Sequence, residues 1–318
     1  MEEKGKKGRM DYTLLLIVVL LVVIGLVILY STSAYNGQVK FHDSFYYLKK
    51  QAFATVLGIV LMLFVAGMDY HIWQRLAVFG YLAAVALSVA VMLFGREING
   101  SKRWLALGPF SFQPSEFAKV ALILFLADLV TKNVKTIGKM WTLCRIMFWI
   151  LPIVGLVGAS NLSTAIIILG IGVILIFVAS PKYAQFAMMG IAGACFMGIF
   201  LALESYRLER LAIWRNPEKY EKGYQTLQGL YAIGSGGVFG VGIGNSVQKL
   251  GFVPEAQNDM IFSIICEELG LAGAGIIVFL FLLLIWRFFL IASGSRDLFG
   301  ALIATGAMAH MMIQVILN

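Results

Sequence analysis

The chain has 318 residues and a formal net charge of +8, and 60% of its residues are hydrophobic while only 13% are charged. An ordinary soluble domain carries about 25% charged and roughly 45–50% apolar residues, so this composition excludes a soluble enzyme and indicates that lipid is the solvent. Basic loops in a membrane protein have a simpler cause than nucleic acid, and we therefore predict no nucleic-acid partner.

Apolar stretches long enough to cross a bilayer, about 20 residues each, recur along the whole chain. The first runs from about Tyr12 to Tyr30 and is too long for the apolar part of a signal peptide, typically about 7–15 residues. Further stretches lie near 52–68, 76–94, 114–131, 143–159, 162–180, 183–203, 264–290 and 298–317. The sequence thus predicts an all-α, polytopic membrane protein with about nine spans, forming one domain over residues 1–318.

The orientation in the membrane follows from Lys and Arg, which favour the cytoplasmic side in short loops. With a cytoplasmic N-terminus, and with the long polar interval near 204–260 left out, twelve such residues fall inside and six outside. The six are Lys40, Lys49, Lys50, Arg96, Lys102 and Arg103. We therefore expect a cytoplasmic N-terminus and an extracytoplasmic long interval, with the outward cations facing an anionic ligand, anionic lipid headgroups or solvent.

Charged residues cluster where the fourth span begins. Arg103 precedes Trp104, which fits either a binding site or an interfacial anchor flanked by snorkelling cations. Pro114 suits a first helical turn, where a carboxylate such as Glu116 is favoured. Lys119 lies three residues on, on the same face. Charges inside a span usually face a cavity and pair, so Glu116 and Lys119 are either site residues or a structural pair.

The long interval opens with a cationic segment. Arg207, Arg210 and Trp214 would share one face of a helix lying at the membrane interface. Arg matches phosphate geometry well, although a solvated or headgroup-facing surface explains the pattern equally. A glycine run from Gly234 to Gly244 follows and matches neither a dinucleotide fingerprint nor a P-loop. Such glycines allow close backbone approach to protein or ligand.

Asp259 lies where the polar interval re-enters apolar sequence. We expect a partly desolvated carboxylate there, with a pKa raised toward that of a useful general base. The alternative is a helix N-cap, a position that Asp favours. Glu267 and Glu268 follow, either as further site residues or as tolerated charges. The three Cys and three His residues are scattered, so we predict no metal site.

These motifs together closely resemble the SEDS family, which comprises the FtsW, RodA and SpoVE proteins. The stretch from Gly244 to Leu250 is more similar to the FtsW and SpoVE branch than to RodA. The resemblance extends from the first span to the last residue. It is carried by Asn99-Gly100 with Arg103-Trp104, Gln113-Pro114-Ser115-Glu116 with Lys119, Gly223-Tyr224-Gln225, Gly234 to Gly244, Gln248-Lys249, Pro254-Glu255-Ala256 with Asp259, and Glu267-Glu268-Leu269-Gly270.

The resemblance implies a peptidoglycan glycosyltransferase of the bacterial cytoplasmic membrane, acting at the division septum with a class B penicillin-binding protein. It would polymerise lipid II, using as donor a glycan strand linked to undecaprenyl pyrophosphate. Asp259 matches the position of the family's proposed catalytic carboxylate. Cations would hold the leaving pyrophosphate, and a divalent ion such as Mg²⁺ could share that load. The predicted substrate-binding residues are Arg103, Glu116, Lys119, Arg207, Arg210, Lys249 and Glu255.

Two departures from the family pattern stand out. Ser160-Asn161-Leu162 occupies a place before the sixth span where the family often has an acidic residue. The sequence also stops at Asn318, where we expect the family's tenth span to follow. Two other readings stay open: a scaffold that positions the penicillin-binding protein without catalysis, and a transporter that flips lipid II.

Overall fold

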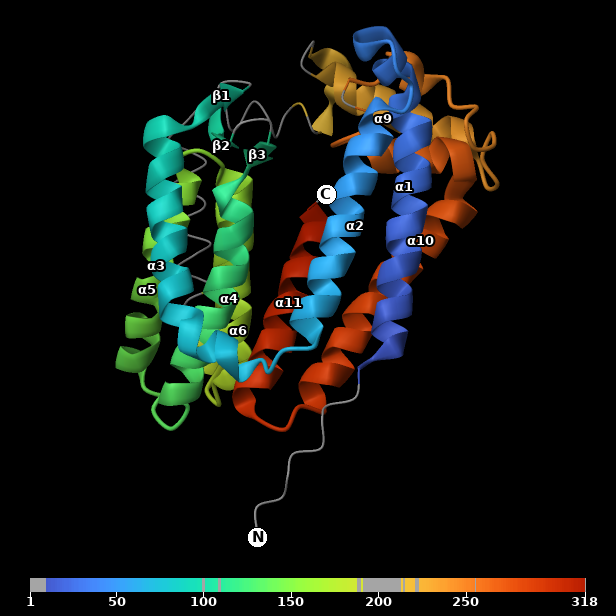
Figure 1. The fold of residues 1–318 in the computed structure, drawn as a ribbon. Helices are drawn as coiled ribbons and strands as arrows, with labels where there is room; N and C mark the ends of the chain where they lie inside the picture. Colours follow the sequence, from blue (N-terminus) through green and yellow to red (C-terminus); the bar gives the residue numbers. More distant parts are fainter. Residues whose placement is uncertain are drawn as a thin grey trace. The chain divides into compact units, whose positions relative to one another are not determined.

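The computed structural model describes residues 10–98, 101–107, 110–187, 190, 213, 215–220, 223–254 and 256–317 (Figure 1). The described chain is almost entirely helical, as predicted. Its long helices are α1 (Tyr12–Phe41), α2 (Tyr46–Ala66), α3 (His71–Phe94), α4 (Pro114–Asn133), α5 (Met140–Gly158), α6 (Leu162–Ala179), α9 (Tyr224–Gly236), α10 (Ile261–Ser293) and α11 (Leu298–Leu317). Short 3-10 turns form at Pro217–Lys219 (η1) and Gln248–Leu250 (η3).

Within the described residues, seven helices are long and apolar enough to cross a membrane: α1, α2, α3, α5, α6, α10 and α11. Helix α4 coincides with a further predicted span but carries Glu116, Lys119, Asp128 and Lys132. The predicted span at 183–203 lies mostly outside the described residues. The protein is therefore a multi-pass membrane protein.

Local sequence explains where several helices begin and end. Asp11 caps α1 by accepting a hydrogen bond from the N–H of Leu14 at 2.9 Å. The same helix ends at His42, which adopts the left-handed conformation with φ of 56°. Pro114 occupies the first turn of α4 with Glu116 beside it, as predicted. Asn161 caps α6 through Thr164.

The described residues form two compact units. The first comprises Met1–Gly67 and Gly193–Leu284. In it α1 packs beside α2, and Ile28 of α1 joins Ile265, Cys266 and Ala274 of α10 in one buried cluster. A second cluster joins Ala232 of α9 to Ile264 of α10. The amino-terminal part of α10 is therefore held by both α1 and α9.

The second unit comprises Met68–Ala192 and Ile285–Asn318, with α3, α4, α5, α6 and α11 around one apolar core. Its most enclosed side chains include Leu122 and Leu126 of α4, Ile146 of α5, Ile168 of α6 and Leu302 of α11. Between α3 and α4 the chain forms β1 (Arg96–Ile98), β2 (Ser101–Leu107) and β3 (Phe110–Phe112), paired antiparallel in that order (Figure 1).

The sequence analysis missed these strands. Ile98 pairs with Ser101, and the sequence between them is Asn99-Gly100, the dipeptide most typical of a two-residue hairpin turn. We considered this region only as a binding site or an interfacial anchor and did not use that signal. The hairpin carries Arg103 and leads directly into α4, so it matters for the placement of the predicted site residues.

Candidate functional site

Asp259 lies in the turn immediately before α10, in the first unit. Its side chain is exposed and makes no hydrogen bond with any residue that the structure describes. The prediction of a partly desolvated carboxylate is therefore wrong, because Asp259 lies outside the helix while its neighbours Ala256 and Gln257 are buried instead. The N-cap alternative is also unsupported, since α10 begins only at Ile261 and its first N–H groups bond to backbone oxygens of Asn258 and Met260.

The glycine run contacts protein backbone. Helix α10 is interrupted at Gly270, whose φ of 67° and ψ of −173° are not helical. The carbonyl oxygens of Glu267 and Glu268 accept hydrogen bonds from Val241 and Gly242, both at 2.9 Å. The N–H groups of Leu271 and Ala272 donate to Gly237 and Val238, both at 3.0 Å. The segment 237–242 thereby supplies the hydrogen bonds that the break removes from α10.

Only glycine fits at the centre of this contact. A Cβ on Gly270 would lie 2.4 Å from the nitrogen of Gly240 and from the oxygen of Val238. A Cβ on Gly240 would lie 2.2 Å from the oxygen of Glu268. The expectation that the glycines allow close backbone approach is confirmed at these positions, and their partner is the protein itself.

Glu267 and Glu268 are both buried beside the break. The Glu268 carboxylate lies 2.6 Å from Lys249 Nζ and accepts a hydrogen bond from Ser31 Oγ of α1 at 2.7 Å. The Glu267 carboxylate accepts hydrogen bonds from Ser246 Oγ at 2.5 Å and from the N–H of Val247 at 3.0 Å. Lys249, which we predicted to contact substrate, is itself only 6% exposed.

In the second unit Glu116 and Lys119 form the predicted pair, with Lys119 Nζ 2.8 Å from Glu116 Oε2. Lys119 also donates to Gln314 Oε1 of α11 at 3.3 Å, and His310 shares that oxygen at 2.7 Å. The sequence analysis did not predict this link between α4 and α11, because 195 residues separate Lys119 from Gln314. Polar residues on an apolar span were its only available signal.

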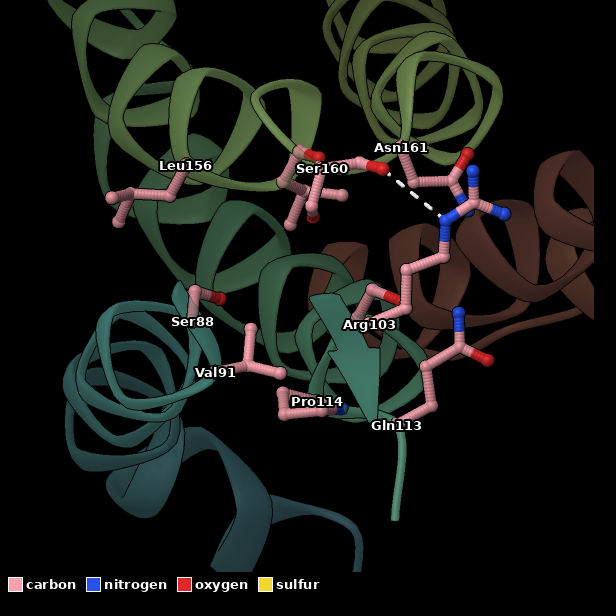
Figure 2. A pocket seen from close by; sticks show the side chains of 10 residues that line it. Ser88, Val91, Arg103, Gln113, Pro114, Leu156, Ser160 and Asn161 are labelled. Atoms are coloured by element: carbon pink, nitrogen blue, oxygen red, sulfur yellow. Dashed lines mark hydrogen bonds between the residues drawn. The ribbon is translucent and has the colours of Figure 1, made fainter. Parts of the chain in front are cut away.

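Arg103 lies on β2 at a small pocket, also in the second unit. Its Nε donates to the backbone oxygen of Ser160 at 3.2 Å, and Figure 2 shows the guanidinium beside Asn161. The pocket is lined by Ser88, Val91, Arg103, Gln113, Pro114, Ser115, Leu156, Val157, Ser160 and Asn161. None of these lining residues is acidic, and their polar groups suit an anionic or hydroxyl-bearing group. Asn161, noted in the sequence as a departure, caps α6 at this place.

Three predicted residues, Arg207, Arg210 and Glu255, lie outside the described residues, as does Trp214. Across the part of the chain that the structure describes, no three His, Cys, Asp or Glu side chains gather closely enough to hold a metal ion together. The candidate residues therefore fall into two groups. The first unit holds the exposed Asp259 carboxylate and the buried Lys249–Glu268 pair, and the second unit holds the Glu116–Lys119 pair of α4 and Arg103 of the hairpin.

Comparisons with known proteins identify the family of the chain. A family model of the FtsW, RodA and SpoVE proteins, described as cell cycle proteins, matches residues 12–318. The stage V sporulation protein E of Bacillus subtilis is 37% identical over 326 residues, covering 98% of this chain and 87% of that protein. A probable peptidoglycan glycosyltransferase FtsW of Trichlorobacter lovleyi is 33% identical and covers 97% of this chain and 82% of that protein.

Solved structures share the fold as well. The rod shape determining protein RodA of Thermus thermophilus is 27% identical with a TM-score of 0.68, covering 97% of this chain and 83% of that one. A chain from a peptidoglycan synthase complex, solved to describe the coordination of polymerization and crosslinking, is 28% identical with a TM-score of 0.79. That match covers 96% of this chain and 85% of the other.

Proposed function

Because the chain belongs to the FtsW, RodA and SpoVE family of cell cycle proteins, we propose that it is a peptidoglycan glycosyltransferase that polymerises lipid II into glycan strands. The observation that carries the proposal is Asp259, an exposed carboxylate with no side-chain partner among the described residues, next to a tightly held helix start. A carboxylate left free in this way is available to a substrate.

The chemistry needs one base and one stabilised leaving group. The Asp259 carboxylate takes the proton from the sugar hydroxyl of an incoming lipid II molecule. That oxygen attacks the anomeric carbon of the donor strand from the face opposite to the pyrophosphate. The bond to undecaprenyl pyrophosphate breaks, the leaving group keeps the electron pair, and the α-linked donor becomes a β-linked product.

Cations stabilise the charge on the leaving pyrophosphate. Arg103 is the described candidate on a pocket surface, and Arg207 and Arg210 remain predictions. Lys119 and Glu116, already paired, would bind substrate as a unit, and Glu255 remains the next candidate base. A divalent ion such as Mg²⁺ at the pyrophosphate also remains a prediction, for which the described residues offer no cluster of ligands.

The proposed setting is the cytoplasmic membrane of a bacterium, with the N-terminus inside and Asp259 on the outer side. A class B penicillin-binding protein is the proposed partner. The similarity to a chain from a complex that joins polymerization and crosslinking supports this pairing. Action at the division septum is in keeping with the similarity to FtsW.

The deciding experiment compares the parent protein with Asp259→Asn in polymerisation of purified lipid II, with and without the penicillin-binding protein. Asn keeps the shape of Asp but cannot accept the proton, and a general base contributes typically 10²–10⁴-fold. We expect at least about a hundredfold loss. Glu218→Gln, which removes another exposed carboxylate of the same polar interval, is the matched control and should retain the parent rate.

Three outcomes would contradict the proposal in different ways. Polymerisation by Asp259→Asn near the parent rate would show that Asp259 is not the base. A parent protein that never polymerises lipid II, but that is needed for crosslinking by its partner, would favour the scaffold. Transfer of lipid II across vesicles without polymer formation would favour the flippase.

A further inference from the structure

Lys249 and Glu268 form a buried ion pair. Lys249 is 6% exposed and Glu268 1%, and their charged atoms lie 2.6 Å apart. Ser31 of α1 bonds to both, at 3.0 Å from Lys249 Nζ and 2.7 Å from the Glu268 carboxylate. A phosphate could reach this ammonium only after the pair had opened. The geometry therefore argues against Lys249 as a direct contact of the leaving pyrophosphate.

The pair lies on both sides of Asp259 in the sequence. Lys249 belongs to the turn η3 that precedes Asp259, and Glu268 to the first part of α10 that follows it. Their contact therefore closes a loop of chain that contains the exposed Asp259. Ser31 attaches this closure to α1, so three separate segments meet at one ion pair.

Further contacts fix the same loop. Asn36 of α1 donates to Gln257 Oε1 at 3.0 Å, two residues before Asp259. Val253 and Ala256 are buried with Ala232 and Ile264. The chain on either side of Asp259 is thus immobilised while the carboxylate itself remains exposed. This is the arrangement that a catalytic group needs, since its position must be set before substrate binds.

The break at Gly270 explains why the Lys249–Glu268 pair can set the direction of the first part of α10. It separates the first part of α10, Ile261–Leu269, from the rest of the helix, so this short part is not aligned by the long part through continuous helical hydrogen bonds. Its direction is set instead by segment 237–242 and by the side chains of Glu267 and Glu268. We infer that Lys249 and Glu268 are positioning residues, which hold the start of α10 so that Asp259 meets its substrate. This inference rests on the proposed function and reassigns Lys249 within it.

The kinetic test uses Lys249→Met, Glu268→Gln and the double variant Lys249→Met/Glu268→Leu in the lipid II assay. Displacing a catalytic group by about 1 Å costs about a hundredfold in rate, so each single variant should lose about that much in kcat with KM changed less than about twofold. The double variant leaves no buried charge unpaired and should recover at least about tenfold over either single variant. Lys135→Met, which removes an exposed lysine between α4 and α5, should leave both constants unchanged.

A direct contact with pyrophosphate predicts a different pattern. Lys249→Met would then raise KM, Glu268→Gln would stay near the parent rate, and the double variant would show no recovery. That result would overturn the inference while leaving the proposed glycosyltransferase activity intact.

A second readout does not depend on activity. With the native cysteines replaced by Ala, Asp259→Cys is labelled by a membrane-impermeant maleimide in the parent background and in each variant. Loss of either Lys249 or Glu268 should change the labelling rate at residue 259 several-fold, with partial return in the double variant. The rate at a control cysteine, Lys49→Cys at an exposed position in the first turn of α2, should stay constant. Equal rates at residue 259 in all backgrounds would refute the inference, even in a chain that never polymerised lipid II.

Discussion

The ammonium of Lys119 and the carboxylate of Glu116 lie 2.8 Å apart, yet the lysine side chain is 1% exposed and the glutamate side chain 52%. The pair is therefore asymmetric. Without Lys119, Glu116 would remain partly solvated. Without Glu116, the Lys119 ammonium would stay buried with the neutral Gln314 as its remaining acceptor.

From this asymmetry we expect Glu116→Gln to destabilise the protein more than Lys119→Met. Stranding a buried charge costs about 3–5 kcal/mol, and the partial exposure of Glu116 puts the expected loss near the lower end, about 3 kcal/mol. Lys119→Met should cost about 1 kcal/mol, the scale of an exposed pair. Chemical unfolding in detergent measures both, and the double variant gives the coupling. A larger loss for Lys119→Met would show that the carboxylate is the stranded partner.

The Gly270 break gives a second prediction. Gly270→Ala should abolish stable folding or lower the melting temperature strongly, because a Cβ would lie 2.4 Å from two backbone atoms and the φ of 67° disfavours any side chain. Gly275→Ala, in the same helix with nothing within 4 Å of its new Cβ, is the control and should be neutral or more stable by up to about 1 kcal/mol. Equal thermal melting of the two variants would contradict the described contact.

A third prediction concerns stability in acid and the contact between Tyr70, just before α3, and Asp297, just before α11. The Tyr70 hydroxyl donates to Asp297, and this hydrogen bond raises the pKa of Tyr70 to about 12. Burial alone would raise the pKa of Asp297, but hydrogen bonds from the N–H of Gly300 and from Tyr70, with nearby His71, outweigh it and lower that pKa.

Because the pKa of Asp297 is lower in the folded protein than in the unfolded chain, its contribution is present above about pH 4 and is lost as the pH falls through the folded value. Tyr70→Phe should lower stability at pH 7 by about 0.5–1.5 kcal/mol and weaken the dependence on acid pH. Unfolding at pH 7 and at pH 3 tests this. Tyr12→Phe, at a 74% exposed tyrosine, should change neither, and an identical acid profile for both variants would contradict the assignment.

A fourth prediction addresses Asn161, whose Oδ1 accepts a hydrogen bond from the N–H of Thr164 at 3.2 Å. Asn161→Ala should cost about 1 kcal/mol, because it removes the cap of α6. Asn161→Asp should keep the cap and be at least as stable, since a carboxylate is favoured at a helix amino end. Thermal unfolding of the two variants against the parent decides it, and equal loss in both would rule out capping.

A fifth prediction concerns topology. A reporter fused near Lys135, between α4 and α5, should report the cytoplasm, and one near Lys222, in the polar interval outside the described residues, should report the outer face. The basis is the excess of Lys and Arg on the inner side of the short loops. The reverse result would reject the orientation, and with it an outward-facing Asp259.

The sequence analysis predicted well those features that depend on residues close together in the chain. Apolar runs of about 20 residues are unmistakable, and eight of the predicted spans coincide with observed helices. The Glu116–Lys119 pair was also predictable, because its members are three residues apart on one helix. The hairpin at 96–112 was readable from Asn99-Gly100, but we weighed only a binding site and an interfacial anchor there.

Contacts between distant segments left no trace in the sequence. Nothing near Lys249 indicated that Ser31, 218 residues away, and Glu268 would enclose it, so its charge was assigned to a substrate. The exposure of Asp259 was likewise unpredictable, since it depends on α10 beginning at Ile261 rather than at Asp259. The break at Gly270 lies in an apolar run whose composition favours a continuous helix.

The hydrogen bonds across that break also bear on how the protein enters the membrane. A span with unpaired backbone groups is costly in lipid, and α10 carries such groups at Glu267, Glu268, Leu271 and Ala272 until segment 237–242 binds them. That segment is synthesised before α10. Segment 237–242 is therefore already present when α10 leaves the translocon. The backbone groups of α10 at the break can form their hydrogen bonds at once, without any later part of the chain.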